Sequence, residues 1–267
     1  MISSKDYNLI QNLKNTDVET YNAVTALLNS QLDEFTFAAH EEKNLISFIS
    51  SSYQFITSHH PEFKQMEFWN DINDSIHSLN KFMNRMTIYR HCHKEGHDKI
   101  HLDNLLYTLP DTVDSFLDSH SYISNNYTFN TCSDNIHIIG DYDAILTAFT
   151  EILINCCDIS DKDIHIVTYT SYDKKYVTAS ISNYGNILDA LSSNHKDTNA
   201  NIPQQPHTLT DDELLHLCTP FFTTNPDSHS GLGLSMVYTV CQKNNGTLSI
   251  SQSNGITTVS IKFPIYE

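Results

Sequence analysis

Hydrophobic residues recur at steps of three, four or seven along the first part of the chain, the spacing of helices that pack through one face. Two such stripes are separated by Pro61, which cannot continue a helix. We expect two long amphipathic helices in an antiparallel hairpin, with a second copy of the chain covering the apolar stripe to give a dimeric four-helix bundle. Residues 5–29 also have a helical pattern. The stripes consist of Leu28, Leu32, Phe35, Ala39, Ile46, Ile49, Tyr53 and Ile56, and of Trp69, Ile72, Ile76, Leu79, Met83 and Met86.

The pattern changes after about residue 100, where short alternating segments mix with helical ones. Strands are expected at 127–131, 135–140, 164–170 and 176–182, and a closing hairpin turns through SNGI. Helices are expected at 102–117 with Pro110 as an interruption, at 141–159 with Asp141 as its cap, and at 233–244, while polar residues 187–208 form a loop. The fold class is therefore an N-terminal helical hairpin, residues 1–100, and a C-terminal α+β two-layer sandwich, residues 101–267.

Charge and composition narrow the possible functions. The chain has 267 residues, with 15 Lys and Arg against 32 Asp and Glu, for a net charge of −17. Such an acidic protein is poorly suited to nucleic acid or to anionic lipid. The longest near-apolar stretch, 144–157, contains Glu151 and Asn155 and is too short to cross a bilayer. With no signal-type N-terminus and no C-x-x-C pair among six cysteines, we expect a cytoplasmic protein with reduced thiols and no membrane insertion.

Three segments of the second half carry candidate chemistry. Helical spacing puts Glu151, Asn155 and Asp158 on one face, a set of oxygens suited to Mg²⁺ and phosphate, or simply the polar edge of a buried helix. Gly185 follows a strand, where it either allows close approach to a ligand or makes an ordinary turn. The run Ser230, Gly231, Leu232, Gly233 and Leu234 opens a helix whose first amides can bind a phosphate.

These segments, in this order, resemble the ATP-binding domain of bacterial sensor histidine kinases, part of the GHKL ATPase superfamily. The resemblance puts Asn155 at the Mg²⁺-binding asparagine, and Asn183 and Gly185 in the first glycine box. PFFTT (220–224) matches the phenylalanine box and GLGLS (231–235) the second glycine box, with Thr257 on the adenine side of the closing hairpin beyond Gly246. ATP and Mg²⁺ are the implied ligands.

The first half then gains a candidate site of its own. FAAHEEKNLISFI (37–49) resembles the phosphoacceptor box of the dimerisation domain. The resemblance implies that His40 is phosphorylated, that Glu41 is the adjacent acid/base, and that Asn44 positions water for dephosphorylating the partner. His40 lies beside the apolar seam and so faces solvent, where a neutral imidazole is a competent nucleophile. The competing interpretation is that one of 15 histidines adjoins a glutamate by chance.

The combined prediction is an ATP-dependent histidine kinase, a homodimer that passes phosphate to an aspartate on a response-regulator receiver domain. Several residues depart from the family pattern: Asn183 for an aspartate, Ile187 for a glycine, Asn225 for a lysine, and Leu45 for a proline. These departures support an alternative, a catalytically degenerate histidine phosphotransferase or pseudokinase with the same fold. A third hypothesis is a scaffold whose bundle docks partners.

A histidine cluster near residue 100 has two interpretations. His93, His97 and His101 step by four and could share a helix face that binds zinc. A solvated hinge between the domains is the alternative that we favour.

Overall fold

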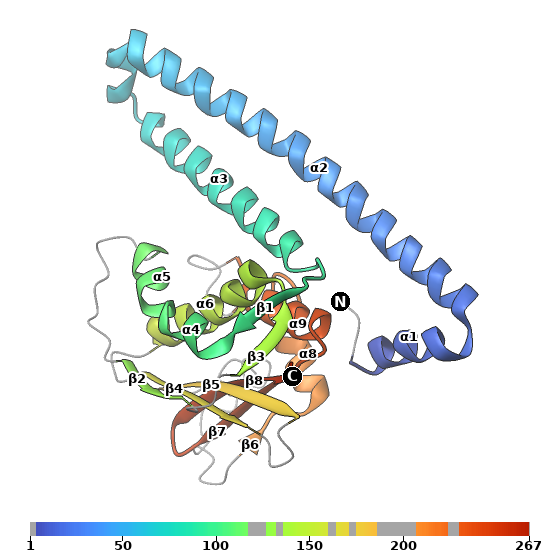
Figure 1. Ribbon diagram of the computed structural model, residues 1–267. Helices are drawn as coiled ribbons and strands as arrows, with labels where there is room; N and C mark the ends of the chain where they lie inside the picture. The colour runs from blue at the N-terminus through green and yellow to red at the C-terminus, as the bar shows by residue number, and fades with distance from the viewer. Residues whose placement is uncertain are drawn as a thin grey trace, which may run out of the picture. The chain divides into compact units, whose positions relative to one another are not determined.

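The computed structural model describes residues 4–116, 127–131, 136–159, 164–170, 175–185, 207–223 and 230–266 (Figure 1). The chain divides into two compact units, residues 2–91 and residues 92–267. Each unit is described by itself.

The first unit is helical throughout its described elements. It comprises α1 (Ser4–Thr16), α2 (Val18–His59), a short 3₁₀ helix η1 (Pro61–Gln65) and α3 (Trp69–His91). Asp17 caps α2 by accepting hydrogen bonds from the backbone N–H and the hydroxyl of Thr20, at 3.0 and 2.7 Å. The predicted hairpin of two long helices is confirmed. Helix α2 also runs without a break past Leu45, the position where the family pattern has proline.

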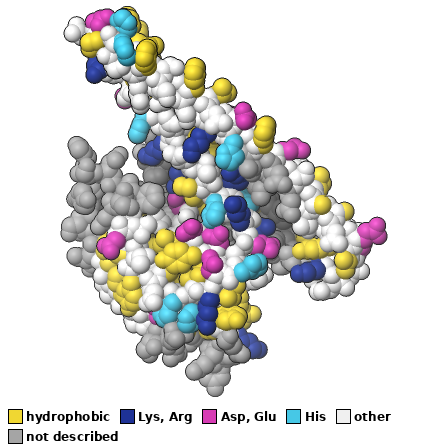
Figure 2. Space-filling view, turned by 45° about the horizontal axis from the view of Figure 1, so that its top comes forward, with side chains coloured by type: hydrophobic (Ala, Val, Ile, Leu, Met, Phe, Trp, Pro, Cys, Tyr) yellow, Lys and Arg dark blue, Asp and Glu magenta, His cyan; other side chains and the backbone are white. Residues whose placement is uncertain are grey.

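Helices α2 and α3 pack against each other, and residues from both predicted stripes are buried where they meet. Ala39 and Ile46 of α2 are buried together with Met83 of α3. Near the turn, the rings of Tyr53 and Trp69 stack at 4.6 Å, and the Tyr53 hydroxyl donates to the Trp69 carbonyl oxygen at 2.8 Å. Many apolar side chains of the unit nevertheless remain exposed, and hydrophobic groups are spaced along its surface in Figure 2. The most exposed on α2 are Phe37, Leu45, Phe48 and Phe55.

The second unit is a layer of helices on a six-stranded sheet. Its order along the chain is β1 (Asp98–His101), α4 (Leu102–Tyr107), α5 (Leu109–Phe116), β2 (Tyr127–Asn130), β3 (His137–Gly140), α6 (Tyr142–Ile159), β4 (Ile164–Thr170), β5 (Tyr176–Tyr184), β6 (His207–Thr208), α8 (Asp211–Leu217), α9 (Gly233–Lys243), β7 (Thr247–Ser253) and β8 (Ile256–Pro264). The sheet order is β2-β4-β5-β8-β7-β6, and β1 pairs separately with β3.

One face of the sheet is buried under α6 and α9, as Figure 1 shows. Alternate residues of β8 are buried, which is the pattern of a strand with one covered face. The turn between β7 and β8 is made by Asn254 and Gly255, both with positive φ (53° and 74°), as an Asn-Gly hairpin turn requires. The predicted two-layer sandwich and its closing hairpin are confirmed.

Several local features differ from expectation or were missed, among them strand β1 and strand β6, which lies at the end of the predicted loop 187–208. The shared helix face for His93, His97 and His101 is wrong, because α3 ends at His91 and His101 lies in β1. The predicted helix 102–117 divides at Thr108, so that Pro110 falls in the first turn of α5, where its missing N–H costs nothing. Helix α8 was missed. The part of the chain that the structure describes contains neither a metal-type cluster of His, Cys, Asp or Glu nor a helix able to span a membrane.

Candidate active site

Two side chains of α6 meet the start of α9. Asp141 caps α6, accepting from the Ala144 N–H at 2.9 Å. Glu151 is only 5% exposed, and Asn155 lies one turn further on. A Cβ added at Gly233 would stand 2.8 Å from Glu151 Oε2 and 3.8 Å from Asn155 Nδ2. The structure thus brings together these predicted residues, and glycine at position 233 leaves the space between them.

The N-terminus of α9 has the properties of an anion site. No side chain caps this 11-residue helix at Leu232, so its first amides lack a capping acceptor. Just ahead, the Ser230 hydroxyl is buried and has no hydrogen-bond partner among the described residues. A buried hydroxyl and uncapped helix amides at one place match the acceptor oxygens of a phosphate.

Gly231, in the segment that resembles the second glycine box, is hydrogen-bonded to Phe221, in the segment that resembles the phenylalanine box. The Phe221 N–H donates to the Gly231 carbonyl oxygen at 2.9 Å. Both residues have positive φ, 68° for Phe221 and 69° for Gly231, and a Cβ at Gly231 would lie 2.5 Å from the Phe221 carbonyl carbon. The His216 ring packs 4.6 Å from the Phe222 ring and joins α8 to the same segment. These contacts hold Gly231, which lies two residues before α9, against the segment of Phe221.

A second group of polar side chains lies at the end of the sheet. Asn183 of β5 pairs in register with Thr257 of β8. The Thr257 hydroxyl donates to the Gly185 carbonyl oxygen at 2.9 Å, and the Gly185 N–H donates to the Gly255 carbonyl oxygen at 3.0 Å. Asn183, Gly185 and Thr257, predicted from distant parts of the sequence, are therefore neighbours.

The amide of Asn183 has a defined orientation. It is 3% exposed, and its Nδ2 donates to the backbone carbonyls of Cys156 (3.4 Å) and Tyr184 (3.3 Å). Two acceptors on one side assign the nitrogen to that side and leave Oδ1 as the acceptor. Asn183 can therefore accept a hydrogen bond from an amino group, as an aspartate would, but without charge.

The thiols near the site are inert. Burial raises the pKa of Cys156 and of Cys218 to about 12, and it raises the pKa of Cys241 as well. These groups stay protonated at neutral pH and cannot act as nucleophiles. The site residues that the structure does describe offer hydroxyl, amide and carboxylate groups rather than Lys or Arg.

Some predicted residues have other positions. Leu232 is fully buried, so only its backbone can serve a ligand, and Leu234 is partly exposed. Asp158 lies in the last turn of α6, and its side chain is outside the described part of the chain. The segments 186–206 and 224–229, which hold Ile187 and Asn225, also lie outside the described residues. His40, Glu41 and Asn44 are all exposed on α2, in the helical unit.

Two features of the site were missed in the sequence but left a signal there. Helix α8 begins with a capping box, in which Thr210 and Glu213 exchange hydrogen bonds between side chain and backbone, the pattern T-x-x-E. Gln252 continues the inward-facing alternation of Leu248 and Ile250 in β7, which indicates a buried polar side chain.

Residues 140–267 match the model of the family described as histidine kinase-, DNA gyrase B-, and HSP90-like ATPase. This match agrees with the resemblance to GHKL ATPases that the sequence predicted. The match contains every site residue named above in the second unit. No curated protein sequence matches the chain.

Several solved structures are similar to this chain. Full-length ShkA in complex with AMPPNP has 10% identity and a TM-score of 0.57, over 87% of this chain and 46% of that one. The Acinetobacter baumannii histidine kinase AdeS has 13% identity and a TM-score of 0.50, over 83% and 96%. The mycobacterial sensor histidine kinase MprB has 18% identity and a TM-score of 0.45, over 63% and 97%. At these identities the likeness to ShkA and AdeS concerns the fold, helical region included.

Proposed function

We propose that this protein is an ATP-dependent histidine kinase that phosphorylates its own His40. The observation that carries the proposal is the unpartnered Ser230 hydroxyl beside the uncapped start of α9, opposite Glu151 and Asn155. Triphosphate oxygens would accept from Ser230 and the α9 amides, and adenine would lie toward Asn183 and Thr257. Asn155, with Glu151 close by, would hold Mg²⁺, which binds oxygen ligands and offsets phosphate charge.

The acceptor chemistry follows from the surface of α2. Ala39 is buried, and His40 beside it is exposed, so the imidazole can meet a substrate. The neutral ring nitrogen attacks the γ-phosphorus, the bond from that phosphorus to the bridging oxygen breaks, and ADP leaves. The proton of the other ring nitrogen passes to the Glu41 carboxylate. The resulting phosphohistidine transfers its phosphoryl group to an aspartate of a response-regulator receiver domain. Asn44 would position the water that hydrolyses this phosphoaspartate and releases inorganic phosphate.

A homodimer completes the proposal. Phe37, Leu45, Phe48 and Phe55 are exposed on α2, and Ile72 and Leu79 are exposed on α3. A single hairpin leaves these side chains in water, and pairing with a second copy would remove many of them from it.

Incubation of the purified protein with Mg²⁺ and γ-labelled ATP tests this function. The wild type should acquire acid-labile, alkali-stable label, and His40→Ala should acquire none. His77→Ala, a change at another exposed histidine of the hairpin, is the matched control and should label normally. Label that persists in His40→Ala, or is absent from the wild type, would refute the proposal.

One observation favours a second candidate, a phosphotransferase that no longer uses ATP. The acceptor offered by Asn183 is neutral where the family pattern has a charged one. This candidate takes phosphate at His40 from a phosphorylated receiver domain, and its melting temperature does not rise with ATP. A scaffold role instead predicts that His40→Ala leaves partner signalling intact.

A further inference from the structure

A row of polar side chains crosses four strands at one end of the sheet. The register pairs Asn183 with Thr257, Thr257 with Gln252, and Gln252 with His207. Residues directly opposite in antiparallel strands point to the same face. Asn183, Thr257 and Gln252 are buried, and so are the residues two positions along each strand, Ile181, Val259 and Ile250. The row therefore lies on the face that the helices cover. Gln252 therefore shares a face with both residues proposed to bind adenine.

Gln252 is the unusual member of this row. Its side chain is only 3% exposed, and neither Nε2 nor Oε1 has a hydrogen-bond partner in the described structure. An amide buried with both its donor and its acceptor unpaired is unfavourable, and such groups in folded proteins are normally served by a ligand or by water. The Gln252 amide is thus a buried hydrogen-bonding group for which the described residues supply no partner.

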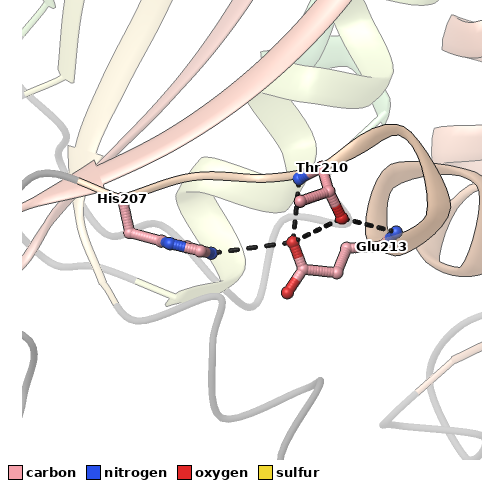
Figure 3. Close-up of polar contacts among 3 residues, drawn as sticks. All are labelled: His207, Thr210 and Glu213. Carbon is pink, nitrogen blue, oxygen red and sulfur yellow. Dashed lines mark hydrogen bonds and ion pairs between the residues drawn. The ribbon is translucent and has the colours of Figure 1, made fainter.

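His207, which pairs with Gln252 in register on the other side, is not a hydrogen-bond partner of the Gln252 amide. His207 directs its Nε2 to Glu213 Oε2, 3.7 Å away, as Figure 3 shows. The same carboxylate oxygen accepts from the Thr210 N–H (2.8 Å) and hydroxyl (2.9 Å). These bonds hold the His207 ring toward α8. His207 is therefore not a partner of the Gln252 amide, and the other residue paired with Gln252 in register is Thr257, one strand spacing or ~4.8 Å away.

We propose that Gln252 is a base-binding residue that helps select adenine, a proposal that rests on the ATP site put forward above. A primary amide carries an acceptor beside a donor. Adenine presents the complement, an amino group beside a ring nitrogen, and glutamine or asparagine pairs with this edge through two hydrogen bonds. Gln252 Oε1 accepts from the amino group, and Nε2 donates to the ring nitrogen. Asn183, held with Oδ1 as its acceptor, is the second group that favours an amino substituent.

Gln252→Met tests the inference, because it keeps the length of the side chain and removes both polar atoms. Gln242→Met, the same change near the end of α9 and away from Gly233, is the matched control. Affinities for Mg²⁺–ATP, for Mg²⁺ with the triphosphate of unsubstituted purine riboside, and for Mg²⁺ with inorganic tripolyphosphate are measured by calorimetry. Gln252→Leu is measured in parallel, in case the methionine variant does not fold.

We expect Gln252→Met to bind ATP about tenfold more weakly, with a smaller loss for the analogue that lacks the amino group. Its affinity for tripolyphosphate and the ATP affinity of Gln242→Met should be unchanged. If the wild type binds ATP and Gln252→Met binds it equally well, the amide is served by buried water and the inference fails while the ATP site stands. An equal loss for tripolyphosphate would also overturn it, because the effect would then not involve the base. A wild type that binds no ATP refutes the proposed function, and the base contact with it.

Discussion

Gly231→Ala is the substitution whose effect the structure defines most sharply, because Gly255→Ala supplies a matched control. Both glycines have positive φ, 69° and 74°, so an added Cβ strains the backbone similarly at each. The surroundings differ. A Cβ at Gly231 would meet three backbone atoms of Phe221 at 2.5–2.8 Å, whereas at Gly255 nothing lies within 4 Å.

The magnitude follows from these two contributions. A left-handed conformation costs a residue with a Cβ about 1–2 kcal/mol, and this is the whole expected loss for Gly255→Ala. At Gly231 the backbone of Phe221 must also move, which disrupts the hydrogen bond from its N–H to the Gly231 carbonyl oxygen. Losing such a bond adds about 0.5–1.5 kcal/mol. Gly231→Ala should therefore be the less stable variant by about 1 kcal/mol or more.

Two measurements check this prediction. Thermal unfolding should place Gly231→Ala at least about 2–4 °C below Gly255→Ala, the shift expected per kcal/mol in a unit of this size. ATP with Mg²⁺ should raise the melting temperature of the wild type and of Gly255→Ala, but not of Gly231→Ala, because the loop that carries Ser230 has moved. Equal melting temperatures, or an undiminished ATP effect in Gly231→Ala, would refute the argument that Phe221 holds this loop.

Further outcomes follow from other contacts. The Thr168 hydroxyl donates to Asp103 Oδ1 at 2.9 Å, and burial raises the pKa of Asp103. Thr168→Val should therefore lower the free energy of unfolding by about 1–3 kcal/mol at pH 8, and by less as the pH falls through that pKa and the carboxylate is protonated. A loss that does not change with pH in urea unfolding would contradict this. Asn183→Asp should lower the stability of the free protein by about 1–3 kcal/mol, because a carboxylate would face two backbone carbonyls. The same change should tighten ATP binding, because the acceptor would then be charged. Calorimetry that shows no gain in affinity would count against Asn183 as a residue that binds adenine. In a Cys132→Ser variant the five remaining thiols are buried, and burial raises the pKa of Cys156 to about 12. Iodoacetamide at pH 8 should therefore label none of them until urea unfolds the protein. Rapid labelling of any thiol, detected by mass spectrometry, would contradict that burial.

Much of the fold could be predicted because local signals agree with it. Helical spacing, Pro61 and the Asn-Gly turn each determine the backbone within a few residues, and the structure follows them. Strand β1 was missed because its four residues alternate too briefly to stand out from a polar stretch rich in histidine. Its conformation depends on pairing with β3, nearly 40 residues later, which no local pattern records.

Some features of the site could likewise be predicted from local sequence, whereas others depend on the tertiary structure. Glu151 and Asn155 share a helix face by spacing alone, so their proximity could be predicted. The contact between Gly231 and Phe221, and the orientation of the Asn183 amide, depend on strands and loops that meet only in the folded unit. The sequence could suggest that Gln252 faces inward, but its lack of partners is a property of the surrounding packing.

These observations bear on how so acidic a protein could hold a triphosphate. With a net charge of −17 and a buried carboxylate at Glu151 beside the start of α9, the described site would bind phosphate through neutral donors, the α9 amides and the Ser230 hydroxyl. Neutral donors work only at short range, so their placement by Gly231 and Gly233 matters more than the total charge. With neutral donors alone, a divalent cation would have to offset the repulsion between the Glu151 carboxylate and the phosphates. Nucleotide binding by this protein should therefore depend steeply on Mg²⁺ and on these two glycines, and weakly on its few lysines.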